Sequence, residues 1–175
     1  MNNLNPPENE ALFNINRCFV CNTSVLDTTI KQCGACKRIS YCSKAHQKED
    51  WNNHKNFCKV IQKVEKEIQH EHLHVDNKVI WLNYRMSLTL RCGELLQRQL
   101  KMYEWQMISY PKRCEVCRST NANIICKNCL CVNYCSEEHK NIDSKFHAEN
   151  CNGLKKADSN VLGRVFDGSW NWSLR

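Results

Sequence analysis

The sequence predicts two small metal-stabilised modules in tandem, joined by an α-helical linker. Three observations predict this fold class. The 175-residue chain contains 14 cysteines, a set of cysteines and histidines occurs twice at matching spacing, and the segment between the two sets has helical apolar periodicity. We therefore divide the chain into a disordered N-terminus (1–17), module one (18–58), a helical linker (59–113), module two (114–151) and a weakly ordered tail (152–175).

The start of the chain does not resemble a targeting segment. Residues 1–8 lack the basic start and the apolar core of a secretory signal, and no run approaches the roughly 20 apolar residues of a membrane span. We expect an intracellular protein of the nucleus or cytoplasm, with no membrane partner. In a reducing compartment, the cysteines are expected to be thiolate metal ligands rather than disulfides.

An internal repeat defines the two modules. Six cysteines and histidines of module one recur 93 residues later in module two. The two sets are Cys33, Cys36, Cys42, His46, His54 and Cys58, then Cys126, Cys129, Cys135, His139, His147 and Cys151. A leading pair, Cys18 and Cys21, recurs at an offset of 96 as Cys114 and Cys117. This agreement in spacing predicts one module used twice.

Each module offers eight ligands for zinc. Zn²⁺ prefers four tetrahedral Cys or His ligands, and a Cys-x2-Cys turn supplies two of them from one short reversal. The ligand order predicts a cross-brace, in which the first and third ligand pairs share one ion and the second and fourth pairs share another. The sites of module one are then Cys18, Cys21, Cys42 and His46, and Cys33, Cys36, His54 and Cys58. Those of module two are Cys114, Cys117, Cys135 and His139, and Cys126, Cys129, His147 and Cys151.

Four zinc ions per chain would fill these sites and leave no position for a reactive water. The last two ligands of each module are spaced i and i+4, which places both on one face of a helix. Ser43 and Ser136 each follow a ligand cysteine directly. A hydroxyl at that position can cap the helix that carries the next histidine.

These residues resemble the MYND zinc-finger family. In module one the resemblance rests on Tyr41-Cys42-Ser43, His46-Gln47, Trp51, His54-Lys55 and Cys58. In module two it rests on Tyr134-Cys135-Ser136, His139, His147 and Cys151. Both modules depart from the family at the sixth ligand, which is usually Cys and is His46 or His139 here. Imidazole is an ordinary zinc ligand, so we expect zinc to be retained.

Two related zinc patterns fit less well. A RING domain would close with Cys-x2-Cys, and a HIT-type finger would place its last histidine closer to the preceding ligand. The MYND resemblance implies small zinc-stabilised α+β modules with a ββα-like scaffold. It also implies a groove for short proline-containing peptides, typically Pro-x-Leu-x-Pro, in transcriptional co-repressors and related assemblies.

In module one the resemblance implies peptide-binding residues at Tyr41, Gln47 and Trp51. Packing of Trp51 into the small core is an equally supported alternative. Module two lacks the Gln and Trp that module one shares with the family. Carry-over of a peptide site to module two is therefore weaker than carry-over of its zinc sites.

The linker has the period of two helices. The apolar residues on its stripes are Ile61, Val64, Ile68, Val79, Leu82, Met86, Leu96, Leu100, Tyr103 and Met107. We expect the break between the helices in the polar stretch 69–77, and the end of the second helix near Ser109 because Pro111 disfavours its continuation. In the tail, Trp170 and Trp172 would dock on the helical linker or belong to a domain that this chain lacks.

Some cysteines and histidines fall outside the repeat. We expect Cys92 to be a core residue of the linker, and Cys131 is a spare thiol or a replacement ligand. His70, His72 and His74 alternate with other residues. An exposed polar turn is favoured there over a further metal site.

The net charge argues against a nucleic-acid partner. The formal charge is +7, but twelve thiolates holding four zinc ions would lower it to about +3. Residues 114–151 contain four Lys or Arg and five Asp or Glu, whereas residues 59–113 contain ten and six. The excess positive charge therefore lies on the linker, where a solvated face is the simpler interpretation.

We expect a protein-binding adaptor rather than an enzyme. The chain shows no phosphate-cradling glycine loop and no activated nucleophile. MYND modules also occur within SET-domain lysine methyltransferases, but the SET cofactor motifs are not seen here. Two modules on a helical spacer could bind two peptides with avidity. The alternatives are a structural zinc unit that supports the helices or a missing C-terminal domain, and a nucleic-acid-binding regulator.

Overall fold

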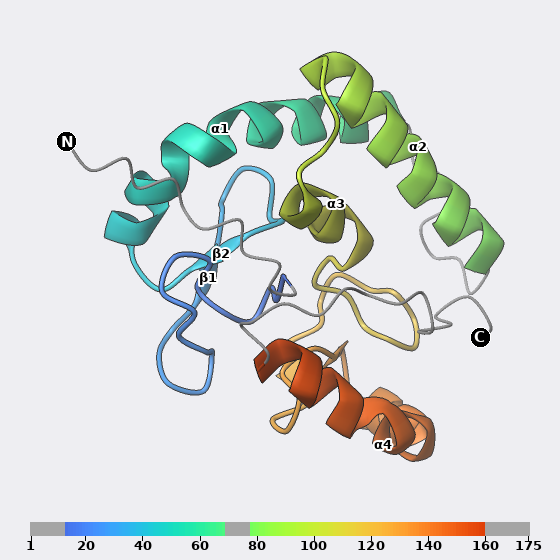
Figure 1. The fold of residues 1–175 in the computed structure, drawn as a ribbon. Coiled ribbons are helices and arrows are strands. Elements are labelled where there is room, and N and C mark those ends of the chain that lie inside the picture. Colours follow the sequence, from blue (N-terminus) through green and yellow to red (C-terminus); the bar gives the residue numbers. More distant parts are fainter. Residues whose placement is uncertain (1–12, 69–77, 160–175) are drawn as a thin grey trace.

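The computed structural model describes residues 13–68 and 78–159 (Figure 1). Each module has the order strand, strand, helix. In module one these are β1 (Lys31–Gln32), β2 (Ser40–Tyr41) and α1 (Lys44–Glu67), and in module two β3 (Ile124–Ile125), β4 (Asn133–Tyr134) and α4 (Glu137–Ser159). The prediction of tandem small zinc-stabilised α+β modules is confirmed.

The two hairpins repeat each other in register. Lys31 pairs with Tyr41 in the antiparallel pair β1–β2, and Ile124 pairs with Tyr134 in β3–β4. Strands this short cannot be stable alone in water. The metal ligands that flank them must therefore hold each hairpin in place.

All four Cys-x2-Cys turns have the same backbone geometry. The residue after the second cysteine has a positive φ of 54° to 59° in each, at Asn22, Lys37, Arg118 and Leu130. Its amide donates to the carbonyl of the first cysteine over 2.8 to 2.9 Å. Non-glycine residues pay a steric cost in this left-handed region. Metal binding must offset that cost at all four turns.

The linker contains a third helix that the sequence did not predict. Beyond α1 lie α2 (Lys78–Leu96) and α3 (Met102–Ser109), and in Figure 1 α3 lies inside the angle that α1 and α2 form. Helix α2 ends just before Gln97, whose φ of +52° is incompatible with a right-handed helix. The helical end at Ser109 agrees with the prediction, whereas the predicted break at 69–77 lies outside the described residues.

An ion pair with a buried carboxylate explains why the chain turns between α2 and α3. The carboxylate of Glu104 is fully buried and accepts two hydrogen bonds of 2.7 Å from the Arg98 guanidinium. It also accepts one of 2.8 Å from the Lys101 amide. These contacts close the turn and start α3. Apolar periodicity alone could not reveal them.

The prediction of which face of α2 packs in the core is wrong. Val79, Leu82 and Met86 form a stripe that suggested a core face, but they are 44% to 63% exposed. The buried stripe is instead Tyr84, Leu88 and Cys92. Because α2 has apolar residues on both faces, periodicity could not tell which face packs.

The buried apolar residues form two separate clusters of different size. One cluster joins the hairpin of module one to the three helices that follow, with fully buried Ile39, Ile61, Leu88 and Ile108. Module two has a separate and smaller cluster. Module one and the linker therefore form one folding unit, whereas module two has its own core.

The segment before the first zinc ligand is ordered from Phe13, although the sequence assigned all of 1–17 to a disordered N-terminus. Phe13 is buried, and its amide donates to Oε1 of Gln106 over 2.9 Å. Asn16 is also buried, and its Nδ2 donates to the Leu130 carbonyl over 2.9 Å. Residues 13–17 therefore bridge module one, α3 and module two.

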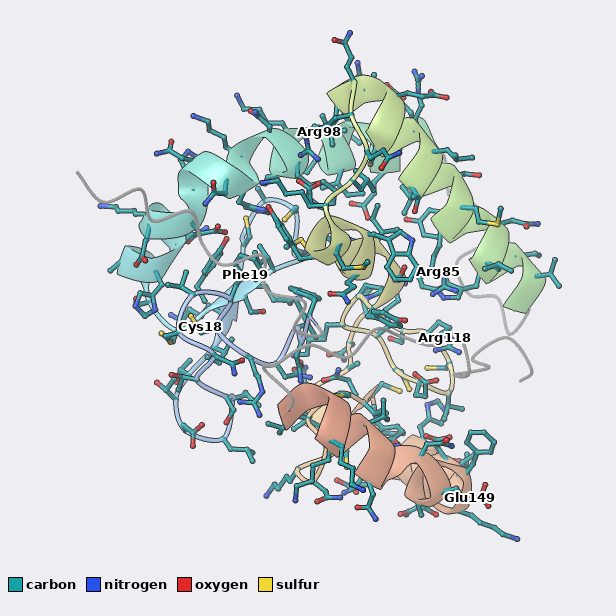
Figure 2. All side chains as sticks on the ribbon, viewed as in Figure 1. Cys18, Phe19, Arg85, Arg98, Arg118 and Glu149 are labelled. Carbon is teal, nitrogen blue, oxygen red and sulfur yellow. The ribbon has the colours of Figure 1, made fainter. Side chains whose placement is uncertain are left out.

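Polar contacts also join α2 to the end of α3 and to the residue that precedes module two. The Arg85 guanidinium donates to the Ser109 carbonyl over 3.1 Å, and the Arg113 guanidinium stacks 5.1 Å from the ring centroid of Trp81. Figure 2 shows Arg85 on α2 on the side that faces the loop of Arg118. Burial lowers the pKa of both Arg85 and Arg113. The basic residues of the linker thus partly serve internal packing.

The last helix of module two continues beyond its final ligand. α4 ends at Ser159, so residues 152–159 extend the module instead of belonging to the weakly ordered tail. The last two ligands, His147 and Cys151, lie on this helix, and the helix continues through the residues that follow them. Trp170 and Trp172 lie outside the described residues. In the part of the chain that the structure describes, no helix is both long and apolar enough to span a bilayer.

Candidate metal centres

The sixteen predicted zinc ligands gather into four groups of four. Within each group the ligand atoms all lie within 4.8 Å of one another. The groups are Cys18, Cys21, Cys42 and His46; Cys33, Cys36, His54 and Cys58; Cys114, Cys117, Cys135 and His139; and Cys126, Cys129, His147 and Cys151. The ligand pairing is that of the predicted cross-brace, and four groups match four zinc ions.

The interatomic distances fit zinc. Tetrahedral ligands at zinc bond lengths lie about 3.8 Å apart for two sulfurs and about 3.6 Å apart for sulfur and nitrogen. The Sγ atoms of Cys33 and Cys58 are 3.9 Å apart, and those of Cys117 and Cys135 are 3.6 Å apart. Sγ of Cys36 lies 3.4 Å from Nε2 of His54. Each Cys₃His group therefore encloses a space of the size that one Zn²⁺ needs.

The repeat extends to the choice of ring nitrogen. His46 and His139 present Nδ1 to their cysteines, whereas His54 and His147 present Nε2. The departure at the sixth ligand thus has one geometry in both modules. In both modules the histidine that replaces the usual cysteine lies in the first turn of the helix, α1 or α4.

The predicted serine caps position these two histidines. The Ser43 hydroxyl accepts a hydrogen bond from the His46 amide, and the Ser136 hydroxyl accepts one from the His139 amide, each over 3.2 Å. Capping satisfies an otherwise unpaired amide at the helix start. The serine, cysteine and histidine together hold the ligands in place.

Outer side chains also contact the sulfurs. Nδ2 of Asn128 donates to Sγ of Cys151 over 3.1 Å, and Nε2 of Gln62 donates to Sγ of Cys58 over 3.5 Å. A Cys₃His site with Zn²⁺ carries one net negative charge. Donors of this kind stabilise the thiolate charge and orient the ligand.

The second zinc sites of the two modules differ in burial. Cys33, Cys36, His54 and Cys58 are all buried, whereas in module two only Cys129 and Cys151 are buried and Cys126 and His147 are partly exposed. The ligand chemistry is the same in both. The difference must come from the surrounding side chains.

A tyrosine–aspartate pair recurs in both modules, buried in module one and partly buried in module two. The Tyr41 hydroxyl donates to Oδ2 of Asp50 over 2.7 Å, and the Tyr134 hydroxyl donates to Oδ2 of Asp143 over 2.9 Å. Burial raises the pKa of Tyr41 and of Asp50. Sequence reasoning missed both aspartates, although each lies at the 93-residue offset of the other. Extending the repeat alignment to non-ligand residues would have found them.

The residues suggested for peptide binding are not equally accessible. Tyr41 is 3% exposed, so its side chain offers no contact surface. Gln47 is partly exposed, and Trp51 is 40% exposed, with its ring edge-on to that of His54 at 6.2 Å. Trp51 thus contacts a zinc ligand and is accessible to solvent.

The cysteines outside the repeat join none of the four groups. Cys92 is fully buried in α2, as expected of a core residue, and burial raises its thiol pKa to about 12. The Cys131 thiol lies 3.1 Å from the Cys129 carbonyl. His70, His72 and His74 lie outside the described residues.

Comparisons with known proteins agree with this geometry. Residues 18–58 match the MYND finger family. Over 79 residues the chain is 36% identical to the mouse histone-lysine N-methyltransferase Smyd1, covering 45% of this chain and 16% of that protein. Over 45 residues it is 47% identical to the SET domain and MYND-type zinc finger protein 6 of Schizosaccharomyces pombe, covering 26% of this chain and 9% of that protein.

A third relative belongs to another enzyme class. Over 46 residues the chain is 39% identical to a Caenorhabditis elegans hypoxia-inducible factor prolyl hydroxylase, covering 26% of this chain and 6% of that protein. The chain thus spans less than a fifth of the length of each of these relatives. No solved structure matches the chain.

Proposed function

We propose that this chain, which carries a MYND finger at residues 18–58, is a non-enzymatic adaptor that binds a short proline-containing peptide through module one. MYND fingers are protein–protein interaction domains. The proposal includes an intracellular site of action, in the nucleus or cytoplasm, within regulatory assemblies such as transcriptional complexes. The observation that carries it is the exposed Trp51 beside Gln47 on α1.

The position of this pair suits an extended peptide. Gln47 and Trp51 are spaced i and i+4, so they lie together on one face of α1. An exposed indole packs well against a proline ring, and a side-chain amide can pair with a peptide backbone. Tyr41 contributes indirectly, by holding Asp50 and the start of α1 in place.

A non-enzymatic role is supported by the closed zinc groups. Four protein ligands at each ion leave no place for an activated water. The relatives named as methyltransferases match this chain over a small part of their length. Their activity is therefore not carried over to it in the proposal.

Peptide binding is proposed for module one only. In module two, Lys140 and Ser144 occupy the positions of Gln47 and Trp51. A lysine and a small hydroxyl do not provide the same stacking surface. The expected stoichiometry is one peptide per chain, and avidity from two equivalent sites is not part of the proposal.

Titration of the zinc-loaded full chain with a Pro-x-Leu-x-Pro peptide tests the proposal, with calorimetry as the readout. Trp51→Ala should weaken binding at least about tenfold, because an aromatic anchor at a small interface contributes roughly 2 kcal/mol. Trp105→Ala is the matched control, since Trp105 is 41% exposed on α3. Native mass spectrometry should show four zinc ions in both variants.

Two results would count against peptide binding at this face. One is wild-type protein that does not bind the peptide, and the other is an equal loss of affinity in the Trp51 and Trp105 variants. Gln47→Ala provides a second test that leaves the indole in place. It should weaken binding without changing the zinc content.

A structural role is the second candidate, and one observation favours it. Module one shares its apolar core with α1, α2 and α3, so its zinc sites stabilise the helical unit directly. In that case the partner surface is the outer face of α2. Binding of a partner that tolerates Trp51→Ala but is lost with Met86→Lys would favour this candidate.

A further inference from the structure

Module two has a surface hollow beside its second zinc site. The hollow has a volume of about 340 Å³, at the small end of the range for ligand sites in proteins. Its lining includes Asn128, Tyr134, Lys140, Ser144, His147 and Cys151. We call this site the module-two hollow. Three ligands of that zinc site, Cys126, His147 and Cys151, form part of its wall.

Comparison with module one explains why the hollow exists. The 93-residue offset matches Ser144 to Trp51, and it matches Ala148 and Asn152 to lysines. Three positions that line the hollow on α4 therefore carry shorter side chains than their counterparts on α1. The backbone scaffold is the same in both modules, so the missing side-chain volume leaves a space.

The most informative of these differences is the missing indole. In module one, Trp51 packs edge-on against His54, and His54 is 1% exposed. In module two, Ser144 leaves the equivalent histidine, His147, partly exposed. The hollow thus has the position and surroundings of an indole site whose tryptophan is absent from the helix.

We propose that an indole of the C-terminal tail, from Trp170 or Trp172, docks into the module-two hollow and covers the second zinc site. The inference concerns module two, and it does not depend on peptide binding by module one. The docked ring would take the place that Trp51 has in module one. Its N–H would be satisfied by the polar rim, which includes Ser144 and Asn128.

Chain length permits this docking. From Ala148 to the end of α4 at Ser159 is about 16 Å of helix. An extended chain from Ser159 to Trp170 spans up to about 36 Å, so the tail can turn back along α4. A tethered group has an effective concentration of roughly millimolar. A modest intrinsic affinity is therefore enough to fill the hollow.

Removal of the apolar indole surface from water would drive the docking. A tryptophan buries on the order of 150–250 Å² when it packs. The tail places two tryptophans within reach of a hollow whose homologous position in module one holds a tryptophan. That coincidence selects the tail over a second copy or an unrelated protein.

Indole ¹⁵N NMR of the zinc-loaded full chain tests the docking directly. Replacing Trp170 and Trp172 individually by Phe assigns their signals. At least one signal should lie away from its random-coil position in the wild type. Ser144→Trp, which fills the hollow from the helix, should return that signal to random coil, whereas the matched control Lys145→Trp on the neighbouring exposed position should leave it unchanged.

Zinc release to a chelator gives a second readout. Replacing both tail tryptophans by Ala should release one zinc per chain about tenfold faster, as expected if the tail covers the site about nine-tenths of the time. Adding Ser144→Trp to that variant should restore slow release. Random-coil indoles in the wild type, or unchanged release from the double variant, would overturn the proposal. A docked signal that is lost on dilution would overturn it too, because it would assign the indole to a second copy.

Discussion

At the scale of single residues, the zinc ligands contribute most to the stability of this chain. The hairpins contain only two residues per strand, and all four Cys-x2-Cys turns contain a non-glycine residue at positive φ. So small a structure has little apolar surface with which to offset the entropy of folding. Metal binding must supply the difference, so each ligand matters more than a typical core residue.

Replacing Cys36 or Cys129 by Ser should unfold the module that carries it and release its zinc. The two variants should differ in extent. Loss of Cys36 should also disturb the helices, because module one shares their core, whereas loss of Cys129 should leave them native, because the core of module two is separate. Native mass spectrometry and ¹⁵N NMR would measure both effects.

Cys131→Ser is the matched control for the cysteine variants. Cys131 belongs to none of the four ligand groups, so four zinc ions should remain bound. Retention of four ions by the Cys36 or Cys129 variant would show that its ligand assignment is incorrect. Loss of zinc from the Cys131 variant would make this thiol a ligand.

At the scale of elements, α2 depends on packing partners far away in the sequence, whereas the start of α3 depends on a short-range ion pair. α2 is apolar on two faces, and only the face of Tyr84, Leu88 and Cys92 finds partners. The start of α3 depends on a carboxylate buried below the surface. Each feature predicts a different response to substitution.

Leu88→Ala should cost about 3 kcal/mol of unfolding free energy, because it removes a fully buried side chain and leaves a cavity. Met86→Lys on the outer face should change that free energy by less than about 0.5 kcal/mol, since Met86 is 54% exposed. Denaturant unfolding of the zinc-loaded chain would measure both. Similar costs for the two variants would mean that the outer face of α2 is covered.

Arg98→Ala should destabilise the turn before α3 by about 3 kcal/mol, because the Glu104 carboxylate would be left buried without its cation. Arg91→Ala is the control, since its partners Glu67 and Glu94 have exposed side chains. An exposed pair of this kind contributes less than about 1 kcal/mol. The same unfolding measurement applies, and equal effects of the two substitutions would contradict the role assigned to Glu104.

At the scale of the whole molecule, the modules are attached to the helical unit in different ways. Module one merges with it through apolar packing. Module two is held by a directional hydrogen bond from Asn16 and by the stacking on Trp81 of Arg113, the residue before its first ligand. Hydrogen bonds of this type fix orientation with modest net energy. The relative placement of the two modules should therefore be sensitive to single polar substitutions.

Asn16→Ala should loosen module two from the rest of the molecule without releasing zinc. It removes the donor to the Leu130 carbonyl, at a cost of about 1 kcal/mol. In residual dipolar couplings, the two modules of the wild type should share one alignment tensor, and those of the variant should need two. Arg17→Ala is the control, because Arg17 donates to the Asn22 carbonyl within module one. A single tensor in the Asn16 variant would show that other contacts suffice.

The sequence by itself determined the metal chemistry and the local structure around it. The ligand types, their pairing, the serine caps and the i, i+4 positions of His54 and Cys58 follow from what Zn²⁺ accepts and from helix geometry. Both requirements act over a few neighbouring residues. A pattern that occurs twice in one chain can therefore be recognised without a structure.

Only the tertiary structure decided which surfaces meet. It showed that Phe13 and Asn16 bridge the modules, that α2 and α3 separate at Gln97, and that Tyr41 is buried while Trp51 remains accessible. It also revealed the hollow beside His147. An apolar or polar side chain contributes according to the partner it finds, and that partner is set by the path of the whole chain rather than by its neighbours in sequence.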